Sequence, residues 1–291
     1  MKKLNMKDNN EKGFLFTFCG LDGCGKTTMI KMLEEKLKNK YNLFLTKQPT
    51  PSVRESAIFR NYMDSENHNE YDYRSLSLLA ASDRVQHTNK VILSELQKGN
   101  IVISDRYFYS CLANLHARGY TKDKWIYEIA ESIVKPDISF FFDVSVNKAV
   151  SRVRAREDER DRYIDMSLQR KLKKNYVDIC KTNGGVLIST EKSIEESFAD
   201  VMEAINKVLC PSQGEKENVI QVLKDISGKE HINETDSLQY ELGLDSLSMV
   251  TLLIRIEEVF NIQLKESDMN PFVLTHVSSV IELVEKYLDI N

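Results

Sequence analysis

A glycine-rich loop near the N-terminus carries the clearest chemistry in this sequence. Residues 20–28 read GLDGCGKTT and fit G-x-x-x-x-G-K-[ST], a pattern that turns backbone N–H groups onto phosphate oxygens. Lys26 is expected to reach the terminal phosphates, and the Thr27 hydroxyl to ligate Mg²⁺. The positions expected to contact the nucleotide are Gly20, Asp22, Gly23, Cys24, Gly25, Lys26, Thr27 and Thr28. The pattern predicts a site for a nucleoside triphosphate and Mg²⁺.

Three further segments resemble one family in chain order. Residues 81–87 read ASDRVQH, residues 104–107 read SDRY, and residues 152–162 form an arginine-rich stretch. Together with the loop they resemble bacterial thymidylate kinases over about residues 13–210. The resemblance implies that Asp105 holds Mg²⁺ through water, that Arg106 grips the acceptor's phosphate, and that Asp22 faces the acceptor's sugar hydroxyl. ATP is the donor that it implies.

The arginine-rich stretch resembles the mobile lid of that family. No arginine follows the first glycine of the phosphate loop, so the resemblance implies that the lid supplies the cation that phosphoryl transfer needs in its transition state. The candidates are Arg154, Arg156, Arg160 and Arg162.

The acceptor side departs from the family pattern. Ala80 stands where family members stack Phe on thymine, and Asn114 and Leu115 replace their Tyr and Gln. Losing a stacked ring and a hydrogen bond to the base would cost roughly 2–5 kcal/mol of acceptor recognition. The positions that the resemblance assigns to acceptor binding are Asp22, Arg60, Ala80, Arg84, Arg106, Asn114 and Leu115.

Two acceptor chemistries remain open. A phosphate acceptor is already a nucleophile, whereas an alcohol needs a carboxylate or His as base. Asp22 and Asp105 could serve as that base, while His87 and His116 are interpreted as packing or surface residues.

A serine in the last third of the chain is the second chemical feature. Residues 241–247 read ELGLDSL and resemble the D-S-L element of acyl carrier proteins, which implies that Ser246 receives 4′-phosphopantetheine. Ser246 lies where an amphipathic helix is expected to begin, and Ser is a natural N-cap. Glu257 and Glu258 lie where carrier proteins show an acidic recognition face. Phosphopantetheinyl transferase and carrier-dependent enzymes are the implied partners.

Alternating strands and helices are predicted to position the phosphate loop. Expected strands cover about 13–19, 43–46, 101–104, 138–144 and 186–189, with helices at 27–38, 74–97, 124–133, 148–155, 166–181 and 194–209. This order predicts a five-stranded parallel sheet covered by helices on both faces. Beyond it, helical patterns at 218–226, 246–260 and 278–288 predict a small all-α four-helix carrier bundle.

Polar stretches divide the chain into its expected parts. Residues 1–12 are expected to form a flexible extension, 13–210 the kinase-like domain, 211–217 a linker, and 218–291 the carrier domain. Residues 213–291 carry 6 Lys+Arg against 15 Asp+Glu, a net charge of −9, whereas the first 212 carry 34 against 29, a net charge of +5. The acidic part disfavours nucleic acid and membrane surfaces as partners.

Five cysteines without a C-x-x-C pair, together with the lack of an apolar leader or spanning segment, indicate a reduced, cytoplasmic protein. A homodimer through the kinase helices is expected by resemblance. Three functions follow: a dTMP kinase that carries a pantetheinylated domain, a specialised kinase with another acceptor in a carrier-dependent pathway, acting in one version on a carrier-tethered substrate, and a non-catalytic nucleotide-binding scaffold for the carrier.

Overall fold

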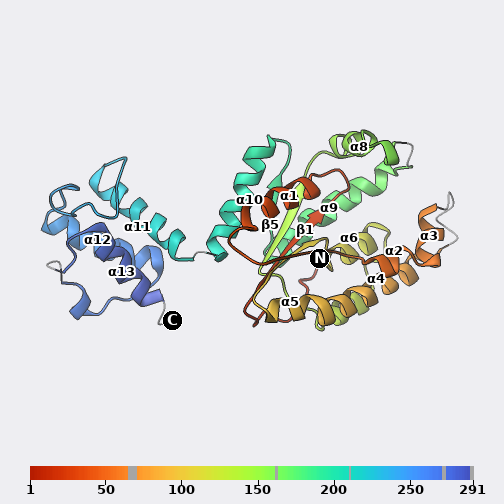
Figure 1. Cartoon of the computed structure of the whole chain (residues 1–291), viewed down its shortest axis with the longest axis horizontal. Coiled ribbons are helices and arrows are strands. Elements are labelled where there is room, and N and C mark those ends of the chain that lie inside the picture. Colours follow the sequence, from red (N-terminus) through yellow and green to blue (C-terminus); the bar gives the residue numbers. More distant parts are fainter. Residues whose placement is uncertain (65–70, 161–162, 210, 271–272, 289–291) are drawn as a thin grey trace. The chain divides into compact units, whose positions relative to one another are not determined.

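The chain folds into two compact units, residues 1–204 and 205–291. The computed structural model describes residues 1–64, 71–160, 163–209, 211–270 and 273–288 (Figure 1). In the described part of the chain, no helix is long and apolar enough to cross a membrane.

A parallel five-stranded sheet forms the centre of the first unit, in the order β2-β3-β1-β4-β5. The strands are β1 Phe14–Gly20, β2 Leu43–Lys47, β3 Ile101–Asp105, β4 Ile138–Asp143 and β5 Val186–Ser189. The inner strands β1, β3 and β4 are almost wholly buried, whereas the edge strands β2 and β5 are partly exposed, as expected when helices cover both faces of a parallel sheet. The predicted sheet and fold class are confirmed.

Helices connect these strands and bring the site residues to the sheet. They are α1 Lys26–Leu37, α2 Pro51–Arg54, α3 Ala57–Asp64, α4 Tyr73–His87, α5 Leu93–Gln97, α6 Tyr109–Ala117, α7 Trp125–Ala130, α8 Val146–Arg154, α9 Met166–Asn183 and α10 Ile194–Leu209. α4 packs against α6, which in turn packs against α9. The sequence pattern did not predict α2, α3 or α6.

The long helix predicted over residues 74–97 is interrupted. α4 ends at His87, a π-helical turn η2 follows at Thr88–Ile92, and α5 then begins at Leu93. Such turns insert an extra residue and often accompany functional sites. Here the interruption follows His87, whose ring is bonded to residues of the β2 end.

The N-terminal residues are docked, which corrects the expectation of a flexible extension. Leu4 and Met6 are buried, and Leu4 N donates to Asn183 Oδ1 at 2.9 Å. Lys7 N donates to Ile133 O at 3.0 Å in a parallel bridge beside Val134. The burial of these two side chains and the two hydrogen bonds fix the segment to the first unit.

The second unit is helical and has its own core. α11 Pro211–Ser227, α12 Ser246–Phe260 and α13 Val277–Leu288 contribute to this core, and a 3₁₀ turn η4 lies at Glu266–Asp268. The fully buried side chains are Val219, Leu223, Leu238, Leu252, Ile256, Val277, Val280 and Val284. Residues 211–217, expected to form a linker, instead belong to α11, since Pro fits the first turn of a helix.

Candidate functional site

The phosphate loop joins β1 to α1 through three glycines with positive φ. Gly20, Gly23 and Gly25 have φ of 146°, 80° and 96°, a region open to glycine at little steric cost. A Cβ at Gly23 would lie 2.2 Å from Ala149 O on α8, so the packing of α8 on the loop also requires glycine there. α1 begins without a side-chain cap, which leaves its first N–H groups for phosphate oxygens.

Lys26 lies under this loop rather than in solvent. Its side chain is buried, and Nζ donates to Leu21 O at 2.7 Å and to Gly20 O at 3.3 Å. A buried ammonium held by loop carbonyls is positioned to stabilise terminal phosphate charge. Cys24 Sγ lies 3.5 Å from the same Nζ.

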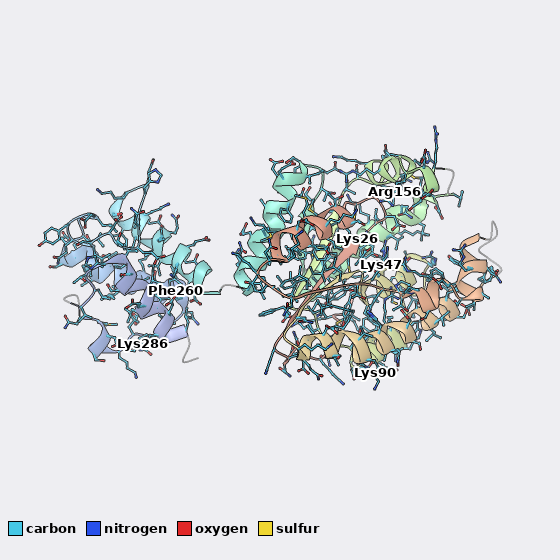
Figure 2. The ribbon with its side chains drawn as sticks, in the orientation of Figure 1. Lys26, Lys47, Lys90, Arg156, Phe260 and Lys286 are labelled. Atoms are coloured by element: carbon cyan, nitrogen blue, oxygen red, sulfur yellow. The ribbon has the colours of Figure 1, made fainter. Side chains whose placement is uncertain are left out.

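The predicted magnesium residues fit a Mg²⁺–nucleotide complex. Thr27 is exposed at the start of α1. Asp105 Oδ1 is buried and has no hydrogen-bond partner among the described residues, while Oδ2 lies 3.2 Å from Lys47 Nζ. Lys26 and Lys47 are labelled in Figure 2. One hydroxyl and one carboxylate suit Mg²⁺, which takes its other ligands from phosphates and water. Within the described ranges, no group of three or more His, Cys, Asp and Glu could hold a metal by itself.

Arg106 joins the end of β3 to the phosphate loop. Its Nη1 donates to Gly20 O and to Tyr176 Oη, both at 3.1 Å, and its Nη2 donates to Asp22. Burial works to lower the pKa of Arg106, but the Asp22 carboxylate, together with Tyr176, Asp105 and Cys24, outweighs it and the pKa is raised. Arg106 therefore stays fully charged.

The backbone at Arg106 is strained. Its φ is 71°, and the conformation is held because Arg106 N donates to Phe18 O at 2.9 Å and Ser104 Oγ donates to Arg106 O at 2.7 Å. A non-glycine residue in this region costs about 1–3 kcal/mol and is found where function requires it. The strain directs this guanidinium towards the loop.

The predicted acceptor residues do not all reach one surface. Arg84 is buried on α4, where Nη1 donates to Ala80 O at 2.9 Å and Nε to Tyr107 O at 3.4 Å. Ala80 is half-buried beside it, whereas Leu115 is fully buried in the core. Arg60 is exposed on α3. The pattern placed Leu115 in the acceptor site, but its burial makes it a packing residue.

Asn114 belongs to a cluster of arginine and tyrosines that the sequence did not reveal. Its Oδ1 accepts from Arg118 Nη1 at 3.0 Å, and Arg118 also donates to Tyr62 Oη at 3.1 and 3.2 Å. The Arg118 guanidinium lies 3.8 Å from the centre of the Tyr73 ring, and burial raises the pKa of Tyr73 to about 12. This cation–π contact fastens α6 to the start of α4. Asn114 is thus engaged with protein groups.

The two histidines have structural surroundings. His87 forms hydrogen bonds through both ring nitrogens, Nδ1 with Gln48 Nε2 at 3.1 Å and Nε2 with Thr46 Oγ1 at 3.0 Å. Burial lowers the pKa of both His87 and His116. The neutral His87 fastens α4 to the β2 end, as expected for a packing residue.

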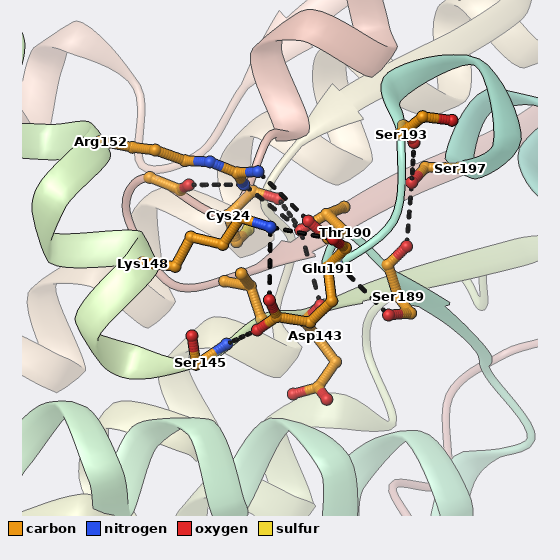
Figure 3. A network of polar contacts seen from close by, with 12 residues as sticks. Cys24, Asp143, Ser145, Lys148, Arg152, Ser189, Thr190, Glu191, Ser193 and Ser197 are labelled. Carbon is orange, nitrogen blue, oxygen red and sulfur yellow. Dashed lines mark hydrogen bonds and ion pairs between the residues drawn. The ribbon is translucent and has the colours of Figure 1, made fainter.

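The lid side presents a different arginine from those predicted. Arg152 on α8 donates from Nη1 to Gly23 O at 3.4 Å and from Nη2 to Thr190 O at 3.2 Å (Figure 3). Thr190 Oγ1 donates to Cys24 O at 3.0 Å, which completes a network beneath the loop. Arg154 is exposed, and Arg156 pairs with Glu159 at 3.1 Å. Arg162 lies outside the described residues.

Ser246 is the first residue of α12, and it is exposed. The cap of this helix is Asp245, whose Oδ1 accepts from Ser248 N at 2.8 Å, so the expectation that Ser246 caps the helix is wrong. The backbone N–H of Ser248 lowers the pKa of Asp245. The Ser246 hydroxyl at a helix N-terminus fits attachment of a phosphate-bearing arm.

The acidic residues of α12 have local roles. Glu257 Oε1 accepts from Leu264 N at 2.7 Å, and Glu258 lies 3.3 Å from Arg255. On the same helix as Ser246, the apolar residues Leu247, Val250 and Ile254 are exposed.

Comparison with known proteins agrees with the geometry of both units. The thymidylate kinase family model matches residues 18–201, and that of the phosphopantetheine attachment site matches residues 217–284. This chain belongs to the thymidylate kinase family. Its second unit is a phosphopantetheine-binding carrier domain, which confirms both resemblances.

Individual thymidylate kinases are similar over about two thirds of the chain. A probable thymidylate kinase of Pyrococcus abyssi (strain GE5 / Orsay) is 32% identical over 205 residues, which cover 68% of this chain and 98% of that protein. One of Thermococcus kodakarensis (strain ATCC BAA-918 / JCM 12380 / KOD1) is 34% identical over 197 residues, 66% of this chain and 93% of that protein. The thymidylate kinase of Onion yellows phytoplasma (strain OY-M) is 31% identical over 201 residues, with 66% and 96% covered.

Proposed function

We propose that the first unit transfers the γ-phosphoryl group of ATP to a nucleoside monophosphate, with dTMP as the family default. The observation that carries this proposal is Arg106, which follows the end of β3 and is bonded to Gly20 O and to the Asp22 carboxylate of the phosphate loop. A guanidinium there can hold an acceptor phosphate next to the donor phosphates. The relatives that bear the name thymidylate kinase support the same reaction class.

In the proposed reaction, an oxygen of the acceptor phosphate attacks the γ-phosphorus. The bond from that phosphorus to the β,γ-bridging oxygen breaks, and ADP leaves with the electron pair. Lys26 stabilises the charge on the transferring group, and Mg²⁺, held by Thr27 and through water by Asp105, would neutralise the phosphate oxygens. We propose that Arg154, Arg156 and Arg162 of the lid also stabilise the negative charge on the transferring phosphoryl group.

No general base is required, since a phosphate acceptor is already a nucleophile. The surroundings of the candidate bases support this choice. Asp22 is paired with Arg106, Asp105 with Lys47, and His87 with Gln48 and Thr46.

The dTMP assignment is tested by incubating purified protein with ATP, Mg²⁺ and dTMP and following ADP and dTDP, with Lys26→Ala as the blank. dTDP formation above the blank is expected. If dTDP does not form, while another monophosphate is phosphorylated, the dTMP assignment is wrong and the reaction class stands.

Two observations favour an acceptor other than dTMP. Ala80 offers no ring for a thymine base, and Leu115 is buried. A specialised kinase in a carrier-dependent pathway, acting on a free or carrier-tethered substrate, is therefore the alternative. A non-catalytic nucleotide-binding scaffold would leave Arg106, with its strained backbone beside the phosphate loop, without an acceptor to hold.

We also propose that Ser246 carries 4′-phosphopantetheine and presents thioesters to carrier-dependent enzymes. Its exposed hydroxyl, which is not the helix cap, supports this role. Incubation with coenzyme A and a promiscuous phosphopantetheinyl transferase should add one arm to wild type and to Ser248→Ala, and none to Ser246→Ala. Equal mass changes in wild type and Ser246→Ala would refute the attachment site.

A further inference from the structure

A second guanidinium lies near Arg106 at the acceptor end of the site. Arg54 ends α2, the short helix that follows β2. Thr50, the residue before α2, donates from its N to Asp83 Oδ2 on α4 at 2.8 Å. Gln48 N donates to Asp105 O at 3.0 Å. α2 is thus fastened both to α4 and to the end of β3, which carries Arg106.

The Arg54 guanidinium is held by a backbone carbonyl group. Arg54 is half-buried, and Nε donates to Pro49 O at 2.7 Å. Pro49 follows Gln48, whose N donates to Asp105 O, so the Arg54 guanidinium is bonded to the segment that is itself bonded to the residue before Arg106. Arg54 therefore lies among the groups at the carboxyl ends of β1 and β3, where ligands bind in open parallel sheets.

This group of side chains has an excess of positive charge. Four cations, Arg54, Arg84, Arg106 and Lys47, stand against three carboxylates: Asp22 pairs with Arg106, Asp105 with Lys47, and Asp83 accepts from Thr50. The hydrogen bonds of Arg84 run to backbone carbonyls. Burial lowers the pKa of Arg54, and the Arg106 guanidinium lowers it further. A bound anion would relieve this repulsion.

We propose that Arg54 and Arg106 together clamp the acceptor's phosphate, and that Arg54, rather than the family-predicted Arg60, is the second guanidinium. The proposal rests on the proposed kinase function and restricts its acceptor to a phosphate monoester. Two planar guanidiniums match the oxygens of a phosphate dianion and give an alcohol little to bind. Arg60 is exposed on α3, the next helix along the chain.

Calorimetric titration of the full chain with dTMP, thymidine and inorganic phosphate tests the clamp without requiring turnover. In Arg54→Ala, the preference for dTMP over thymidine should fall about 10- to 100-fold, with phosphate binding weakened to match and ATP affinity unchanged. Arg54→Lys should recover part of the preference, because it keeps the charge and loses the fork. Lys90→Ala, which removes an exposed charge from η2, is the matched control.

The outcomes separate the clamp from the proposed function. Unchanged phosphate and dTMP binding in Arg54→Ala would overturn the clamp, as would a loss confined to Arg60→Ala. If Arg54→Ala does not fold, the comparison of Arg54→Lys with wild type decides, since equal preference for dTMP over thymidine again overturns it. Weakened phosphate binding together with absent dTDP formation would uphold the clamp and move the search to another monophosphate.

Discussion

The donor and acceptor sides of the first unit use different parts of the chain to bind their ligands. On the donor side, backbone N–H groups, three glycines and one buried lysine form the site. On the proposed acceptor side, Arg106 and side chains of α2 and α4 would decide what fits, and Ala80 departs from the family pattern. A site built from backbone constrains few side chains beyond its glycines, whereas a site built from side chains changes with each substitution. The donor is therefore better specified than the acceptor.

Removal of Lys26 is expected to have the largest effect on the donor side. Lys26→Ala should lower kcat about 10³-fold with any acceptor, because a preorganised charge on the transferring phosphate is lost. ADP release at saturating ATP measures this. Lys31→Ala, an exposed change on the same helix, is the control, and a Lys26→Ala enzyme that keeps a tenth of the wild-type rate would contradict the assignment.

An aromatic ring introduced at position 80 tests how the acceptor side binds a base. Ala80→Phe should lower KM for dTMP about 2- to 10-fold, the range expected for an added aromatic stack. ATP kinetics should not change. Ala80→Leu supplies bulk without a π face, and equal effects of Phe and Leu would show that the acceptor base does not stack at this position.

A smaller effect is expected in the second unit, where the proposed phosphopantetheine site lies at the N-terminus of α12. α1 has no side-chain cap, whereas Asp245 caps α12. Asp245→Ala should lower the melting temperature of the carrier unit slightly, because an orphan N–H loses its acceptor. Glu230→Ala, an exposed acid in a loop, is the charge-matched control.

The pH dependence of this effect has a defined sign. The pKa of Asp245 is lowered in the folded state from an ordinary value of 3.8. Its stabilisation is therefore complete above that value and disappears as the pH falls through the lowered pKa. Thermal melts across this acidic range should converge for wild type and Asp245→Ala, and a difference that persists at the lowest pH would contradict the capping role.

The sequence predicted the parts of the molecule that depend on local patterns. The buried strands, the glycine loop and the amphipathic helix after Ser246 each have a periodicity or spacing that fixes them. α6 was missed because it is apolar on nearly every side, with Tyr109, Leu112 and Leu115 all buried. A helix buried all round has no amphipathic period to detect.

The remaining errors concern contacts between distant segments. Arg118 and Arg152 each contact groups from other elements, Arg118 at Tyr62 Oη and Arg152 at Gly23 O. Composition and spacing do not determine such contacts. The same holds for the docking of Leu4 and Met6, whose polar neighbours predicted an extension in solvent.

An acceptor screen determines whether the first unit phosphorylates a phosphate monoester. Wild type is given ATP, Mg²⁺ and pairs of nucleoside monophosphates and their nucleosides, together with pantetheine as a free alcohol, and kcat/KM is measured for each. For at least one monophosphate we expect a kcat/KM about 10²-fold or more above that of its own nucleoside, and we expect Lys26→Ala to remove this activity. Phosphorylation of alcohols in preference to every monophosphate would contradict it.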